Sequence, residues 1–131
     1  MKNKTVLIID DDARNIFALD LILRSKGYKC ITANGAMSGI DKLKENKEIG
    51  IVLMDMMMPE MDGYEAMTYI RKNLGLIRTP IIAVTAQAMS GDRERCLLSG
   101  ASAYISKPIN TDLLLKLLEE LETPNDGIVN Q

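Results

Sequence analysis

The chain has 131 residues, the size of one ordinary domain that can bury a core of its own. It carries 16 basic and 18 acidic side chains, for a net charge of −2, and it contains no histidine. These values exclude catalysis by a side-chain imidazole and histidine zinc sites, and they argue against a nucleic-acid partner bound through phosphate contacts.

The N-terminus and the cysteines indicate the compartment. The apolar run from Val6 to Ile9 is short and ends in aspartates, which excludes a signal peptide. Cys30 and Cys96 are far apart in apolar contexts, as buried free thiols of a reducing compartment are. No stretch approaches the ~20 apolar residues of a membrane span. We therefore expect a cytoplasmic protein that contacts neither membrane nor nucleic acid.

Five short apolar segments are predicted to be strands. They cover residues 5–9, 29–33, 51–54, 80–84 and 103–106. Most are rich in β-branched residues and bounded by charged or turn residues. Three are apolar almost throughout, which is typical of parallel strands covered on both faces.

Segments with a helical period follow each predicted strand. They cover about residues 16–23, 37–44, 64–74, 89–98 and 113–121. Gly27, Gly75 and Gly100 stand where helix C-terminal caps are expected. Asp62 with Glu65 three residues later resembles a capping box, and residues 59–63 look like a plain turn into a helix.

The alternation predicts one doubly wound α/β domain. Five βα units of about 23 to 27 residues favour a parallel sheet with helices on both faces. The domain is expected to span residues 4–122. Residues 123–131 lose all periodicity and are expected to form a flexible tail or the stub of a linker.

Polar side chains follow four of the five predicted strands. They are Asp10, Asp11 and Asp12 after the first, Asp55 after the third, Thr85 after the fourth and Lys107 after the fifth. In open α/β sheets the functional groups gather at the carboxyl ends of the strands. We therefore expect these side chains to lie on one rim of the sheet.

The chemistry of this rim suits a phosphoryl group. Carboxylates from two strands repel by about 4 kcal/mol per pair at ~4 Å, so a cation such as Mg²⁺ is expected to compensate them. Lys107 would add a fixed positive charge and Thr85 a hydroxyl donor. Asp55 stands alone on the central strand and is the best candidate nucleophile, which would form an aspartyl phosphate.

Each of these residues also has a simpler structural explanation. Asp12 opens a helix, where aspartate commonly serves as the N-cap. Asp10 and Asp11 could be solvated turn residues, Thr85 a strand-end residue, and Lys107 a surface lysine. Their joint occurrence favours the chemical interpretation.

Four sequence blocks resemble the signatures of two-component response-regulator receiver domains. They are residues 8–15 (IIDDDARN), 54–63 (MDMMMPEMDG), 84–86 (VTA) and 104–108 (YISKP), in the expected order and spacing. The resemblance covers about residues 4–122. It implies a flavodoxin-like five-stranded sheet of order 2-1-3-4-5 with five helices.

The resemblance also implies a role for each residue at the rim. Asp55 would be the phosphoacceptor. Asp11, Asp55 and the backbone carbonyl of Met57 would ligate Mg²⁺, for which Mn²⁺ can substitute. Asp10 would act through a metal-bound water, and Lys107 would pair with a phosphoryl oxygen.

Residues around the rim would transmit and time the signal. Thr85 would swing to bond the phosphoryl group, and Tyr104 would follow by changing rotamer. Met57 and Gln87 would flank the path of the attacking water and tune hydrolysis. The peptide bond before Pro108 is cis in many members of the family.

The function implied is a phosphorylation-dependent switch. Because the chain has no histidine, its donor would be a phosphohistidine of another protein or domain, on a sensor histidine kinase or a histidine phosphotransfer protein, or else a small phosphodonor. The fourth helix, fifth strand and fifth helix would then present a changed surface to an unidentified effector. The domain would assist its own phosphorylation and dephosphorylation rather than act as an enzyme, either free-standing or, as its motifs suggest, as the receiver of a hybrid sensor kinase.

Two alternatives use the same residues differently. A magnesium-dependent phosphatase of the haloacid-dehalogenase kind also has an aspartyl nucleophile, but it requires a second aspartate where this chain has Met57. A degenerate receiver would bind partners without phosphorylation, yet all five rim side chains of the receiver pattern are present.

Overall fold

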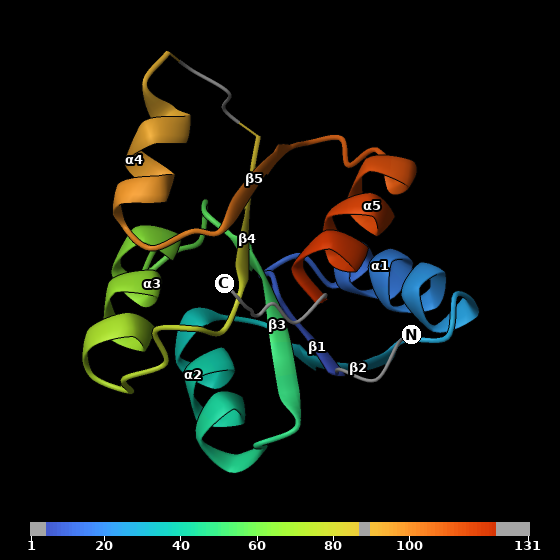
Figure 1. Cartoon of the computed structure of the whole chain (residues 1–131), viewed down its shortest axis with the longest axis horizontal. Helices are drawn as coiled ribbons and strands as arrows, with labels where there is room; N and C mark the ends of the chain where they lie inside the picture. The colour runs from blue at the N-terminus through green and yellow to red at the C-terminus, as the bar shows by residue number, and fades with distance from the viewer. Residues whose placement is uncertain (1–4, 87–89, 123–131) are drawn as a thin grey trace, which may run out of the picture.

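Strands and helices alternate through residues 5–86 and 90–122, the parts of the chain that the computed structural model describes (Figure 1). The strands are β1 (Thr5–Ile9), β2 (Lys29–Ala33), β3 (Ile49–Asp55), β4 (Ile81–Thr85) and β5 (Ala103–Ser106). The helices are α1 (Ala13–Ser25), α2 (Ala36–Glu45), α3 (Gly63–Lys72), α4 (Asp92–Leu98) and α5 (Thr111–Glu122). Within the described residues the predicted element order is confirmed.

The described strands form one parallel sheet in the order β2-β1-β3-β4-β5. Helices α1 and α5 cover one face, and α2, α3 and α4 cover the other (Figure 1). This is the doubly wound, flavodoxin-like arrangement, so the predicted fold class is confirmed. It places the carboxyl ends of β1, β3, β4 and β5 along one rim.

The sheet is buried from both sides, which explains the apolar runs. In β1, Leu7 and Ile9 pack toward α2 and α3, whereas Val6 and Ile8 pack toward α1 and α5. All four side chains are at most 1% exposed. Because successive residues of a strand face opposite layers, a strand covered on both faces must be apolar at every position.

The bounds of β1, β2 and β5 are those predicted, whereas those of β3 and β4 differ by one or two residues. β3 begins at Ile49 and includes Asp55 as its last residue, and β4 ends with Thr85. Pro80 lies outside β4, where it accepts a hydrogen bond from the Val52 N–H (2.9 Å) but has no N–H to donate.

Most of the predicted helix caps are present in the structure. Asp62 and Glu65 form a reciprocal capping box at the start of α3. Gly27 and Gly100 follow the last residues of α1 and α4 with φ of 93° and 120°, a region that favours glycine. Asp12 caps α1 by accepting the Arg14 N–H (2.9 Å), so its structural explanation holds.

Some predicted features concern residues beyond those that the structure describes. Gln87, the expected helix start at Met89 and the expected tail, residues 123–131, lie outside the described residues.

Cys30 and Cys96 are both buried free thiols, as predicted. Among the described helices, none has the length and apolar character needed to cross a membrane.

Candidate functional site

Three carboxylates meet at the rim formed by the ends of β1 and β3. Asp10 and Asp11 follow β1 directly, and Asp55 ends β3, the neighbouring strand. One carboxylate oxygen from each lies within 4.8 Å of the others. Asp10 and Asp55 are 4% and 2% exposed, whereas Asp11 is exposed and faces the open side of the cluster.

Lys107 brings a positive charge to this cluster. Its Nζ lies 3.6 Å from Asp55 Oδ1 and 3.7 Å from Asp10 Oδ2. The side chain reaches the rim from the loop after β5 and is only 24% exposed. Lys107 is therefore a largely buried lysine paired with two carboxylates, and not an ordinary surface lysine.

Backbone and side-chain donors orient the two buried carboxylates. The Met57 N–H donates to Asp55 Oδ1 (3.1 Å), and the Asp12 N–H donates to Asp10 Oδ1 (2.8 Å). Asn15, in the first turn of α1, donates to Asp10 Oδ2 (3.4 Å). Asn15 was not predicted to support the site, and its only sequence signal is its place at the end of the first motif.

The pKa of Asp55 reflects this surrounding. The pKa is raised from 3.8 to about 6: burial raises it most, the hydrogen bond from Met57 lowers it, and the charge of Asp10 raises it. The ammonium of Lys107 acts in the opposite direction but does not cancel the burial. The folded protein thus holds the ionised form of Asp55 at a cost, which a further cation would reduce.

The donor set of this cluster fits a hard divalent cation. Three carboxylates with oxygen ligands converge, one of them on the open side, and Lys107 alone does not balance their charge. Mg²⁺ prefers such oxygen ligands and retains several waters, which suits a site open on one side. Asp10, Asp11 and Asp55 are therefore the residues that could hold it.

Thr85 and Tyr104 lie on the neighbouring strands β4 and β5. Thr85 is 2% exposed, and its carbonyl accepts the Lys107 N–H (2.8 Å). The Tyr104 hydroxyl donates to Asp92 Oδ2 in α4 (3.0 Å). The peptide bond between Lys107 and Pro108 is cis.

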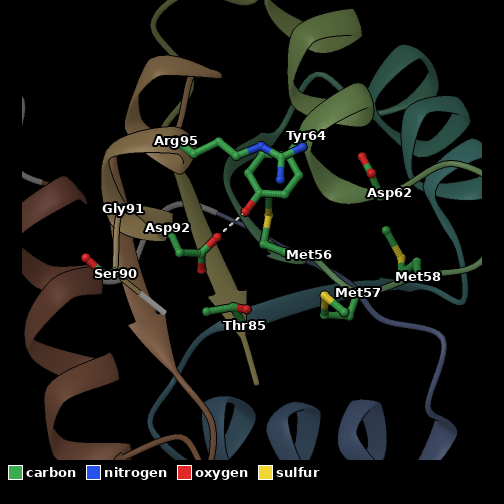
Figure 2. A pocket seen from close by; sticks show the side chains of 10 residues that line it. All are labelled: Met56, Met57, Met58, Asp62, Tyr64, Thr85, Ser90, Gly91, Asp92 and Arg95. Carbon is green, nitrogen blue, oxygen red and sulfur yellow. Dashed lines mark hydrogen bonds between the residues drawn. The ribbon is translucent and has the colours of Figure 1, made fainter. Parts of the chain in front are cut away.

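A cleft of about 790 Å³ opens beside the rim, between the loop after β3 and the start of α4 (Figure 2). Thr85 and Met57 line it on the side of the rim, and Tyr64 and Asp92 line it farther away. Met57 is 49% exposed, so its side chain is accessible to a molecule at this position.

Gly63 has a structural role that sequence reasoning missed. It starts α3 directly against Met56, the residue after Asp55, and its N–H donates to the Met56 carbonyl (3.3 Å). A Cβ at this position would lie 2.8 Å from the Met56 Cα. A side chain here would displace the backbone beside Asp55, so residues 59–63 are more than a plain turn.

The fold and this rim together define a class of protein. A family model described as the response regulator receiver domain matches residues 6–119. The chain belongs to this family: it is a receiver domain of two-component systems, the phosphorylation-dependent switches of signal transduction. The phosphatase and degenerate-receiver alternatives find no support in these comparisons.

Similar proteins include one long and one short relative. The chain is 42% identical over 113 residues to the sensor histidine kinase RcsC of Escherichia coli, covering 86% of this chain and 12% of RcsC. It is 33% identical over 116 residues to the polar-differentiation response regulator DivK of Brucella anthropi, covering 88% of this chain and 94% of DivK. The chain thus spans about an eighth of the length of RcsC.

Solved structures agree on the fold. A CheY-like receiver domain protein from Methanospirillum hungatei superposes with a TM-score of 0.80 at 35% identity, covering 91% of this chain and 94% of that one. The receiver domain of Saccharomyces cerevisiae Ssk1, solved with the histidine phosphotransfer protein Ypd1, gives a TM-score of 0.83 at 28% identity, covering 92% and 89%.

Proposed function

We propose that Asp55 accepts a phosphoryl group from a phosphohistidine of another protein. The convergence of Asp10, Asp11 and Lys107 on the buried carboxylate of Asp55 is the observation that carries this proposal. Since the chain has no histidine, the donor is a sensor histidine kinase or a histidine phosphotransfer protein. The names of RcsC and of the Ypd1 complex support donors of these two kinds.

The transfer forms one bond and breaks another. A carboxylate oxygen of Asp55 attacks phosphorus, the P–N bond breaks, and its electron pair returns to the donor imidazole, which takes up a proton. Asp11, Asp55 and the Met57 carbonyl would hold Mg²⁺ or Mn²⁺, with Asp10 acting through a water, and the bound cation would supply charge neutralisation for the phosphoryl oxygens. Lys107 pairs with one of these oxygens.

The same residues connect phosphorylation to the surface of α4, β5 and α5. Thr85 bonds the new phosphoryl group and Tyr104 changes rotamer, which alters the surface presented to a downstream effector. Met57 and Gln87 tune the hydrolysis that resets the switch. We expect this unit to span residues 4–122, and its buried free thiols suit the reducing cytoplasm.

Acetyl phosphate with Mg²⁺ tests the proposal. We expect intact-mass spectrometry to detect one added phosphoryl group on the wild type, no addition to Asp55→Asn, and wild-type behaviour of Asp41→Asn, an exposed aspartate of α2. Phosphoryl incorporation into Asp55→Asn would overturn the assignment of the acceptor. Failure of the wild type to gain the group would overturn the proposed function.

A further inference from the structure

Two tyrosines from different elements share one carboxylate of α4. The Tyr64 hydroxyl, from α3, donates to Asp92 Oδ1, and the Tyr104 hydroxyl, from β5, donates to Asp92 Oδ2 (3.0 Å). Figure 2 shows the Tyr64–Asp92 bond at the edge of the cleft. Asp92 is the first residue of α4, so this pair of bonds connects three elements where that helix begins.

Further contacts hold Tyr64 in this position. The Arg95 guanidinium lies 3.7 Å from the centre of the Tyr64 ring (Figure 2), and the Cys96 Sγ lies 3.9 Å from its hydroxyl. Burial and the hydrogen bond to Asp92 raise the pKa of Tyr104 to about 12, and burial raises the pKa of Tyr64 as well. Both hydroxyls therefore keep their protons and act as donors at neutral pH.

Apolar packing anchors α4 only weakly. In this helix, every residue of which the structure describes, Cys96 is the one buried side chain. Four residues are buried in α2 and four in α3, and Leu98 at the end of α4 is 89% exposed. The bonds of Asp92 are therefore a large part of what positions α4, and an element with few buried contacts rearranges at low cost.

We propose that Asp92 is a latch that holds the resting arrangement by accepting the hydroxyls of Tyr64 and Tyr104 at the same time. The inference rests on the proposed function, in which Tyr104 changes rotamer after phosphorylation of Asp55. That rotamer change breaks a charge-assisted hydrogen bond to Asp92, while the bond to Tyr64 keeps Asp92 and α4 attached to α3. Asp92 is thus a positioning residue that sets how strongly the switch resists activation.

Removal of the latch should favour the activated arrangement. A ligand that binds only that arrangement binds more tightly when less free energy is spent on reaching it. Beryllofluoride, a phosphoryl mimic, is the probe, used at saturating Mg²⁺ and followed by fluorine NMR. We expect Asp92→Ala to bind it on the order of tenfold more tightly than the wild type, since a charge-assisted bond to Tyr104 is no longer broken.

Graded variants separate a latch from a general loss of structure. Asp92→Asn keeps the shape but offers one acceptor oxygen, so its affinity should lie between those of Asp92→Ala and the wild type. Tyr64→Phe should give a smaller change in the same direction, because Tyr64 only orients Asp92 toward Tyr104 and its own bond is not broken on activation. Glu94→Ala, which removes an exposed carboxylate of the same helix, is the matched control and should bind as the wild type does. Stabilisation by Mg²⁺ alone should be equal in all of them.

Each outcome decides the proposal. Equal or weaker affinity of both Asp92 variants relative to Glu94→Ala overturns the latch, and Asp92→Asn gives this answer even if Asp92→Ala does not fold. The proposed function is then intact provided that the wild type binds beryllofluoride and Asp55→Asn does not. No binding by the wild type would instead refute the proposed function.

Discussion

Burial and charge oppose each other most directly at Asp55. The carboxylate is 2% exposed, close to Asp10, and carries a pKa of about 6 in the metal-free protein. Lys107 at 3.6 Å and the Met57 N–H at 3.1 Å offset part of this cost. A buried acid that stays reactive at neutral pH is typical of a functional group rather than of a residue selected for stability.

The raised pKa predicts how stability depends on pH. Between the unfolded value of 3.8 and about 6, the folded protein binds more protons at Asp55 than the unfolded chain does. This residue therefore destabilises the fold increasingly as pH rises through that interval. An asparagine at this position carries no charge to bury. Asp55→Asn should therefore be more stable than the wild type by up to about 3 kcal/mol above pH 6.

Urea unfolding in the presence of a chelator measures this difference. The advantage of Asp55→Asn should be larger at pH 8 than at pH 4, because at low pH the wild-type carboxyl is protonated in both states. Asp41→Asn, at an exposed position, should give the same difference from the wild type at both pH values. An advantage that shrinks as pH rises would contradict the assignment of the raised pKa to Asp55.

At the scale of elements, the side chain of Arg71 joins the loop between α3 and β4 to the loop between α4 and β5. Arg71, in the last turn of α3, donates to the carbonyls of Leu76 (2.7 Å) and Thr79 (2.6 Å) in the loop before β4. It also donates twice to the carbonyl of Gly100, at 3.0 and 2.6 Å, in the loop before β5. All three carbonyls lie at the end of the sheet opposite the rim, where Arg71 supplies a donor for each of them.

Replacement of Arg71 should therefore destabilise the fold without touching the rim. We expect Arg71→Met to lower the free energy of unfolding by about 2–4 kcal/mol, because several carbonyls lose a charged donor at once. Arg71→Lys should recover only part of this, since an ammonium lacks the planar fork of the guanidinium. Urea unfolding provides the measurement, with Lys72→Met as the exposed neighbouring control.

The functional result is as informative as the stability. Well below its melting temperature, Arg71→Met should still accept a phosphoryl group on Asp55. Full recovery of stability by Arg71→Lys would show that charge alone, and not the arrangement of five donors, closes the two loops.

For the molecule as a whole, the rim is where stability is given up for function. The sheet is packed on both faces, yet its carboxyl edge gathers three carboxylates, and the ammonium of Lys107 contacts only Asp10 and Asp55 among them. Mutual repulsion at this edge opposes folding, and a ligand that binds only the folded state offsets it. Metal binding and global stability should therefore be linked.

Mg²⁺ should raise the melting temperature of the entire chain. At a concentration 100 times its dissociation constant the stabilisation is about 2.7 kcal/mol, which for this size corresponds to a shift on the order of 10 °C. Differential scanning calorimetry with and without a chelator measures it. Asp11→Asn should lose most of the shift and Asp41→Asn should retain it; equal shifts in both variants would argue against the carboxylate cluster as the metal site.

The sequence predicted much of the candidate site because of one geometric rule. Parallel strands of one sheet end at one edge, so residues that follow β1, β3 and β5 had to lie near one another. The sequence could not indicate that Lys107 pairs with both Asp10 and Asp55, or that Asn15 donates to Asp10. Those contacts depend on side-chain conformation and on how far α1 and the loop after β5 stand from the sheet.

By itself, the sequence determined the order of strands and helices, the burial of the central strands and the edge at which the charged groups gather. Periodicity and caps encode these features, since they depend on neighbours within a few residues. Only the tertiary structure decided which distant groups meet, such as Asp92 with Tyr64 and Tyr104, or Arg71 with Gly100. Such pairs are set by the packing of separate elements against a shared sheet, and no local pattern carries that information.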